Sequence, residues 1–103
     1  MIQVSIHDNE ITMNGHARYA PIGQDIVCAS VSTLFQVLIQ SLEELTSTQI
    51  EYTLSPGQAS VKWEYLSESS KVLVDAFVIG IRMIVHAYPK YVQLSTMTRR
   101  ESH

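Results

Sequence analysis

Two long apolar stretches, each preceded by a pair of short alternating segments, constrain the fold of this chain more than any other feature. The first stretch runs from Gln24 to about Leu45, and its apolar residues recur at steps of four and three. That spacing predicts an amphipathic helix with one continuous apolar stripe. The stripe consists of Val27, Val31, Leu34, Leu38, Leu42 and Leu45.

The second stretch, residues 69–88, predicts another helix with Ser67 as its N-cap and Pro89 as its stop. Its apolar arc is wide, which indicates burial on two sides, against the sheet and against another helix or subunit. One side carries Val72, Ala76, Ile79 and Met83, and Leu73, Phe77, Ile84 and Ala87 adjoin it.

The remaining segments alternate apolar and polar residues, as strands with one buried face do. Residues 2–7 and 10–14 predict one hairpin, and residues 50–54 and 61–65 predict a second around the turn at 55–58. Residues 91–94 predict a last strand. The order ββαββαβ favours an α+β fold, a two-layer sandwich of two long helices on a mainly antiparallel sheet.

Composition places these elements in one domain, residues 1–103, with a polar tail from about 98. Hydrophobic residues make up 46% of the chain and charged residues 17%, which suits a compact fold. Both apolar stretches contain polar or charged residues and there is no secretory signal pattern, so we expect a cytoplasmic protein without membrane spans. A net charge of −3 argues against direct nucleic-acid binding and is compatible with a basic peptide as partner.

The only cysteine, Cys28, lies in the first turn of the first predicted helix. A lone cysteine excludes an internal disulfide and a CxxC site, and is more often a buried small hydrophobe than a nucleophile. Two features favour reactivity here. The first-turn amides favour a thiolate, and His16 lies at the other end of a loop whose two ends meet at the same sheet edge.

Asp25 and Ser32 flank Cys28 on this helix, and each has two interpretations. Asp25 is a helix-start carboxylate, or a group that fixes the loop or orients His16. Ser32 shares a helix face with Cys28, so its hydroxyl can donate toward the thiol or a substrate carbonyl, or bond the carbonyl of residue 28. One cysteine and scattered histidines do not supply a metal site, and there is no phosphate-binding loop.

Three short motifs together resemble the ribosomal-processing cysteine protease family, whose motif is written G-H-A … G-x-D-I-V-C-x-x-V-S. They are Gly15-His16-Ala17, Gly23 with residues 25–28, and Val31-Ser32. The order of elements and the length also look like that family, so the resemblance covers nearly the whole chain.

The resemblance implies a cytoplasmic cysteine endopeptidase, without a cofactor, that removes the N-terminal extension of large-subunit ribosomal protein twenty-seven. That extension is apolar and aromatic before the cut and basic after it, and the family is usually dimeric. Cys28 would be the nucleophile and His16 the general acid/base, with amides at the helix start as oxyanion donors. Asp25 and Ser32 would support the site, and Gly15 and Gly23 would give the loop its freedom. Residue 18 is expected to be small in many members, whereas this chain has Arg18. The 17–24 loop is expected to close over the peptide.

Two rival hypotheses give these residues no proteolytic role. In the first, the chain is a non-catalytic ribosome-assembly or peptide-binding module in which Cys28 is buried and inert. In the second, Cys28 is a redox-sensing thiol. Alkylation of Cys28 and its dependence on His16 would discriminate the protease from the binding module.

Overall fold

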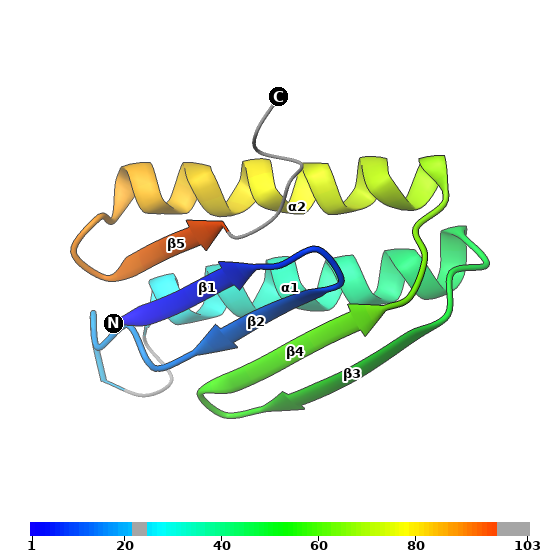
Figure 1. Ribbon diagram of the computed structural model, residues 1–103. Helices are drawn as coiled ribbons and strands as arrows, with labels where there is room; N and C mark the ends of the chain where they lie inside the picture. The colour runs from blue at the N-terminus through cyan, green and yellow to red at the C-terminus, as the bar shows by residue number, and fades with distance from the viewer. Residues whose placement is uncertain (22–24, 97–103) are drawn as a thin grey trace.

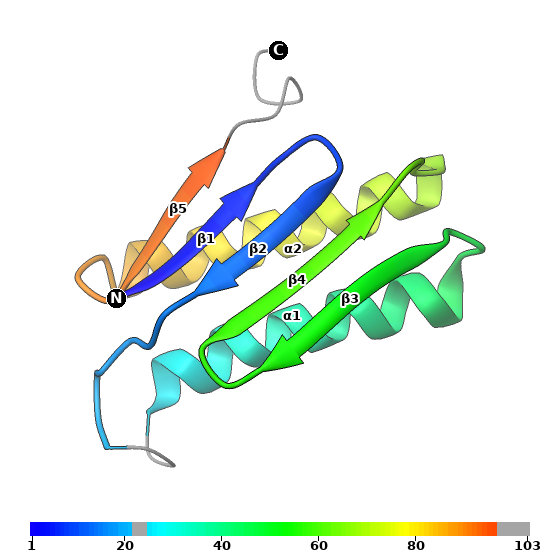
Figure 2. The same cartoon turned by 60° about the horizontal axis from the view of Figure 1, so that its bottom comes forward.

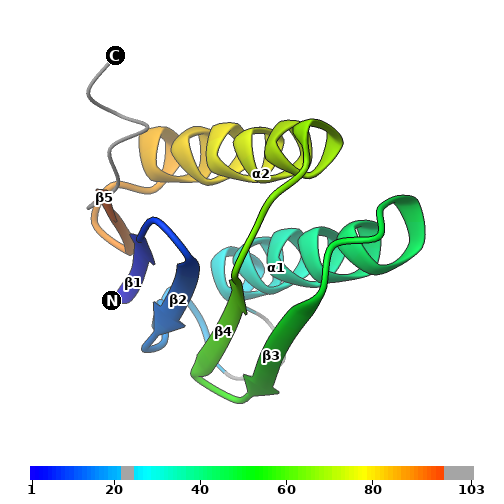
Figure 3. The same cartoon turned by 45° about the vertical axis from the view of Figure 1, so that its right-hand side comes forward.

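Both helices cover the same face of a single five-stranded sheet (Figures 1 and 3). The computed structural model describes residues 1–21 and 25–96. The predicted α+β sandwich and the order ββαββαβ are confirmed. The elements are β1 Ile2–Ile6, β2 Glu10–Asn14, α1 Ile26–Leu45, β3 Ile50–Ser55, β4 Gln58–Trp63, α2 Glu68–Ala87 and β5 Val92–Thr96.

The strands are arranged in the order β3-β4-β2-β1-β5. Every pair is antiparallel except β1 and β5, which run parallel with Ile2 opposite Val92. The two hairpins meet where β2 pairs with β4, and the last residue of β2, Asn14, lies opposite Gln58. This register places the chain that leaves β2 beside the β3–β4 turn (Figure 2).

The core lies between the sheet and the two helices. The residues that α1 contributes to it differ in part from the predicted stripe. The buried residues of α1 are Val27, Val31, Phe35, Leu38, Ile39 and Leu42. Leu34 is half-buried, and its side chain faces α2, where it lies next to Gly80. Leu45, the last helical residue, is 70% exposed, so its place in the predicted stripe was wrong.

Helix α1 is also long and apolar enough, by length and composition, to cross a membrane. Core helices pass the same test. The buried residues of α1 belong to the same core cluster as residues of the sheet and of α2, which is how a core helix packs.

Helix α2 begins as predicted, with the hydroxyl of Ser67 accepting a hydrogen bond from the amide of Ser70 at 3.3 Å. Its buried face carries Ser70, Val74, Phe77, Val78 and Ile81. No described residue covers the second apolar side, where Val72, Ile79 and Met83 are 66%, 54% and 67% exposed.

The second hairpin is tighter than predicted. Gly57 has a φ of +75°, and with Pro56 before it the pair can form the two central residues of a close turn, so Ser55 and Gln58 pair directly. Strand β4 therefore begins at Gln58 and ends at Trp63, which is buried. Tyr65, predicted within this strand, lies beyond it and is 77% exposed.

Candidate active site

Most of the residues that the sequence singled out lie between the end of β2 and the first two turns of α1. These ends of the two elements lie near each other in Figure 2. The chain leaves β2 at Asn14, passes His16 and enters α1 at Ile26. The predicted residue Gly23 lies outside the residues that the structure describes.

One carboxylate, that of Asp25, fixes the start of α1 and the preceding loop together. Its Oδ1 accepts hydrogen bonds of 2.9 Å from the amides of Val27 and Cys28, as an N-cap does. Its Oδ2 accepts a 2.9 Å hydrogen bond from the amide of Tyr19. Both interpretations of Asp25 as an N-cap and as a loop anchor therefore hold, and no hydrogen bond in the described chain joins it to His16.

The same contacts set the charge state of Asp25. Partial desolvation raises the pKa of its carboxyl, but hydrogen bonds donated to the carboxylate lower it by more. The pKa of Asp25 therefore lies below its ordinary value. The donors are the amides of Cys28, Tyr19 and Ala20 and the side chain of Cys28.

The sulfur of Cys28 is half-buried and accepts a hydrogen bond from the backbone amide of Ala17 at 3.2 Å. The amides of Val27 and Cys28, expected as oxyanion donors, instead donate to Asp25 in this structure. The amide directed at the sulfur comes from the loop beside His16.

His16 is exposed, and its imidazole lies against the β3–β4 turn. A Cβ placed on Gly57 would lie only 2.6 Å from Nε2 of His16. No hydrogen bond joins His16 to Cys28 among the described residues. The two residues thus share the β2–α1 junction, with the imidazole packed on the turn and the sulfur bonded to the adjacent loop.

Two backbone positions around His16 have positive φ. Gly15, at +98°, donates its amide to the carbonyl of Gly57 at 2.8 Å, and a Cβ there would lie 2.3 Å from the carbonyl oxygen of Met1. Only glycine fits such a position. Arg18, at +58°, adopts a conformation that L residues disfavour. It turns the chain between Ala17 and Tyr19, whose amides reach Cys28 and Asp25.

Ser32 lies one turn along α1 from Cys28 and borders a cavity of about 300 Å³. Phe35 of α1, Leu54 of β3 and Pro56 of the β3–β4 turn also line it. Within the described chain, the hydroxyl of Ser32 bonds neither the thiol nor the carbonyl of Cys28. The cavity is therefore a mostly apolar recess beside the helix face that carries Cys28.

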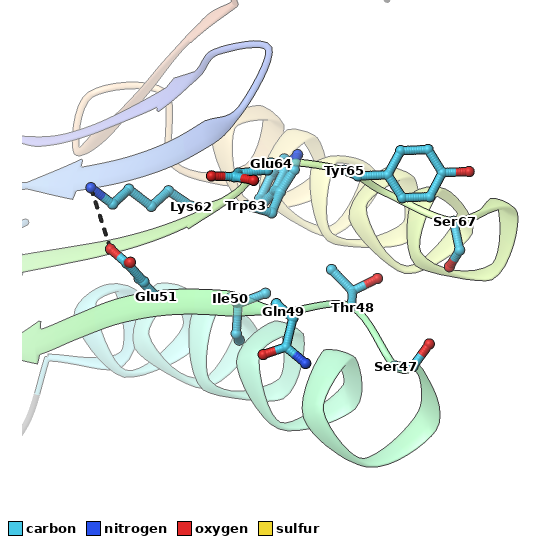
Figure 4. Close-up of a pocket in the computed structure, with 10 residues that line it drawn as sticks. All are labelled: Ser47, Thr48, Gln49, Ile50, Glu51, Lys62, Trp63, Glu64, Tyr65 and Ser67. Atoms are coloured by element: carbon cyan, nitrogen blue, oxygen red, sulfur yellow. Dashed lines mark ion pairs between the residues drawn. The ribbon is translucent and has the colours of Figure 1, made fainter.

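A larger cavity, of about 710 Å³, lies at the other end of α1 (Figure 4). Ile50, Trp63 and Tyr65 line it, and the ion pair between Lys62 and Glu51, at 3.5 Å, lies at its side. It borders Ser47, just past the C-terminal end of α1, which places it about 25 Å along the helix from Cys28. This cavity is separate from the β2–α1 junction.

Residues 1–21 and 25–96 contain no cluster of three or more His, Cys, Asp or Glu side chains placed to hold a metal ion.

The model of one protein family, described as cysteine protease Prp, matches residues 1–93. The chain belongs to the cysteine protease Prp family. It is therefore a cysteine peptidase by family, and the family resemblance inferred from its sequence is confirmed.

Relatives and a solved structure agree with this assignment. The ribosomal processing cysteine protease Prp of Mycoplasma pneumoniae is 24% identical over 103 residues, covering 98% of this chain and all of the relative. That of Mycoplasma genitalium is 27% identical over 97 residues, covering 92% and 95%. The fold is that of the S. aureus protease Prp solved with a covalently linked product peptide. That structure has a TM-score of 0.89 and 21% identity, and the match covers 94% of this chain and all of that one.

Sequence reasoning missed two contacts of the site. The amide of Ala17 donates a hydrogen bond to the sulfur of Cys28, and the β3–β4 turn packs against His16 at Gly57. A backbone amide has no signature in side-chain identity. The turn was visible as Ser55-Pro56-Gly57-Gln58, but only the pairing of β2 with β4 brings it to His16.

Proposed function

We propose that the chain is a cysteine endopeptidase that removes the N-terminal extension of large-subunit ribosomal protein twenty-seven in the cytoplasm. The observation that carries the proposal is Cys28 in the first turn of α1, its sulfur bonded by the Ala17 amide beside His16. The family assignment and the relatives' name as ribosomal processing proteases support it.

In the proposed reaction, the Cys28 thiolate attacks the scissile carbonyl and forms a carbon–sulfur bond. The carbon–nitrogen bond then breaks as His16 gives its proton to the leaving amine. Water, deprotonated by His16, then attacks the resulting thioester. The carbon–sulfur bond breaks, which releases the N-terminal fragment as a carboxylic acid and regenerates the Cys28 thiolate. The proposal requires the imidazole to approach the sulfur when peptide binds, and such catalytic contacts often tighten only in the complex.

The recess beside Ser32 supports an apolar residue before the cut. Its volume of about 300 Å³ and its lining by Phe35, Leu54 and Pro56 suit an aliphatic or aromatic side chain. The net charge of −3 suits the basic residues that follow the cut.

We further propose that the protein works as a homodimer joined through α2. Val72, Ile79 and Met83 form an exposed apolar stripe along one side of this helix. A second copy that covers the stripe would remove these side chains from water.

The direct test is incubation with a peptide that copies the apolar-to-basic extension, followed by mass spectrometry. We expect two fragments with the unaltered protein and none with Cys28→Ala. Ser30→Ala is the matched control, because among the described residues the Ser30 hydroxyl bonds only the carbonyl of Ile26 on the same helix. Cleavage that persists in Cys28→Ala would contradict the mechanism.

Alkylation of Cys28 separates the protease from the two rival hypotheses. Iodoacetamide is expected to modify Cys28 at neutral pH, and more slowly in His16→Ala. An inert thiol in a protein that binds the peptide without cutting it would favour the binding module. Loss and recovery of function with peroxide and reductant, without peptide turnover, would favour the redox sensor.

A further inference from the structure

The imidazole of His16 rests on the one position of the β3–β4 turn that has no side chain. A Cβ on Gly57 would lie 2.6 Å from Nε2, 3.0 Å from Cε1 and 3.3 Å from Cδ2 of His16. Carbon atoms in favourable contact lie about 3.5–4.0 Å apart. Any side chain at position 57 must therefore displace either the ring or the turn.

The turn is held in place by the backbone on both sides of this contact. The carbonyl of Gly57 accepts a 2.8 Å hydrogen bond from the amide of Gly15, the residue before His16. This bond continues the β2–β4 pairing, in which Asn14 lies opposite Gln58. The backbone next to His16 and the turn under its ring are thus linked at the end of the β2–β4 pairing, so a movement of the turn would also strain that pairing.

Gly57 has a φ of +75°, and in this conformation the side of its Cα where a Cβ would stand faces the imidazole ring. Pro56 before it has its φ fixed near −65°, which suits the first central position of a turn whose second central residue has positive φ. The imidazole makes no side-chain hydrogen bond within the described chain, so packing is what restrains its orientation.

We propose that Gly57 is a positioning residue for His16: the bare turn sets where the imidazole lies relative to Cys28. Gly57 touches the ring and acts on the reaction only through it. The catalytic part of this inference rests on the proposed protease function, whereas the packing part does not.

Kinetics test the catalytic part, with Gly57→Ala compared with Gln58→Ala, an exposed neighbour in the same hairpin. We expect Gly57→Ala to lower kcat on the extension peptide by about tenfold or more, with KM within about twofold. Gln58→Ala should retain the original kcat. An unchanged kcat in Gly57→Ala would overturn the assignment.

A double-mutant cycle tests the packing part without substrate. Gly57→Ala is made in the unaltered chain and in His16→Ala, and the urea midpoint of each is measured. Strain from positive φ is common to both backgrounds, so a smaller loss of midpoint in His16→Ala reports the ring contact alone. Equal losses would overturn the inference, and this result stands even if the peptide is never cut.

Gly57→Asn serves as the second variant should Gly57→Ala fold poorly, because asparagine tolerates positive φ yet still carries the Cβ. In either folded variant the imidazole Hε1 NMR signal of His16 should move. The signals of His7 and His86 should stay in place. An unmoved His16 signal in a folded variant would count against the contact.

Discussion

At the scale of single residues, Asp25 connects more of the site than any other side chain. Its two oxygens serve different partners, the helix amides of Val27 and Cys28 on one and the loop amide of Tyr19 on the other. Removing this carboxylate should therefore loosen the loop as well as the helix start.

We expect Asp25→Ala to lower the free energy of unfolding by about 1 kcal/mol near neutral pH, the usual value of an N-cap. Because the pKa of Asp25 is lowered in the folded state, its contribution is complete above the ordinary carboxyl pKa, roughly pH 4. The contribution is lost as the pH falls through the lowered value. Urea unfolding of both proteins between pH 7 and pH 2 should show the difference shrinking only at the acid end.

Ser67→Ala is the matched control, because Ser67 caps α2 through a hydroxyl that does not titrate. Its cost should stay constant over the same pH range, and peptide cleavage should be retained. A difference between Asp25→Ala and the unaltered protein that grows toward acid pH would contradict the lowered pKa.

The candidate nucleophile and its histidine could be named from sequence because their residue types and neighbours are specific. The positions of their partners could not. Arg18 is an example. Its positive φ directs the flanking amides inward, and the residue type arginine does not predict that backbone conformation.

At the scale of elements, α1 and α2 approach each other at Gly80. A Cβ on this residue would lie 2.9 Å and 3.1 Å from the two methyl carbons of Leu34. These atoms are the free end of a flexible side chain, which can turn aside at small cost.

Gly80→Ala should therefore leave the free energy of unfolding within about 1 kcal/mol of the original, because the gain in helix propensity offsets the displacement of Leu34. Gly80→Val adds bulk that the interface cannot absorb and should cost about 1–3 kcal/mol. Chemical denaturation measures both.

Gly15→Ala supplies the contrast for this pair. Its Cβ would meet the Met1 carbonyl oxygen at 2.3 Å, a backbone atom that cannot turn aside, and its φ is +98°. It should cost more than about 2 kcal/mol. A loss well below this in Gly15→Ala would mean that the backbone at Met1 can move away from the added Cβ at little cost in stability.

The periodicity of each element was sufficient to predict its type and approximate bounds. It was not sufficient to assign every buried position on α1, where apolar residues flank the stripe. Phe35 and Ile39 enter the core, whereas Leu34 turns toward α2, because a helix that packs on both a sheet and a second helix has two inner sides.

At the scale of the whole molecule, the exposed stripe on α2 should govern the oligomeric state. Ile79→Glu places a charge where the proposed partner would bury it, which costs several kcal/mol unless the charge is paired. We expect a dimer by light scattering for the unaltered protein and a monomer for Ile79→Glu, with similar unfolding midpoints at low concentration.

Gln93→Glu adds the same charge at an exposed position of β5 and should leave the dimer intact. A monomer from the unaltered protein at micromolar concentration would contradict the proposed assembly.

The order of elements along the chain was predictable, whereas the order of strands in the sheet was not. Alternation reports which face of a strand is buried but not which strand lies next to it. The parallel pairing of β1 with β5 therefore had no signal in either segment alone.

That pairing also has a consequence for how the protein is made. β1 obtains its second neighbour only when residues 92–96 have been synthesised, so the first and last strands of the sheet cannot pair before then. Contacts between such distant segments slow folding, because a long loop must close before they form. The start of β1 also packs on Gly15, next to His16. We therefore expect chains that lack β5 to show no peptidase activity, with activity arising only once residues 92–96 can pair with β1.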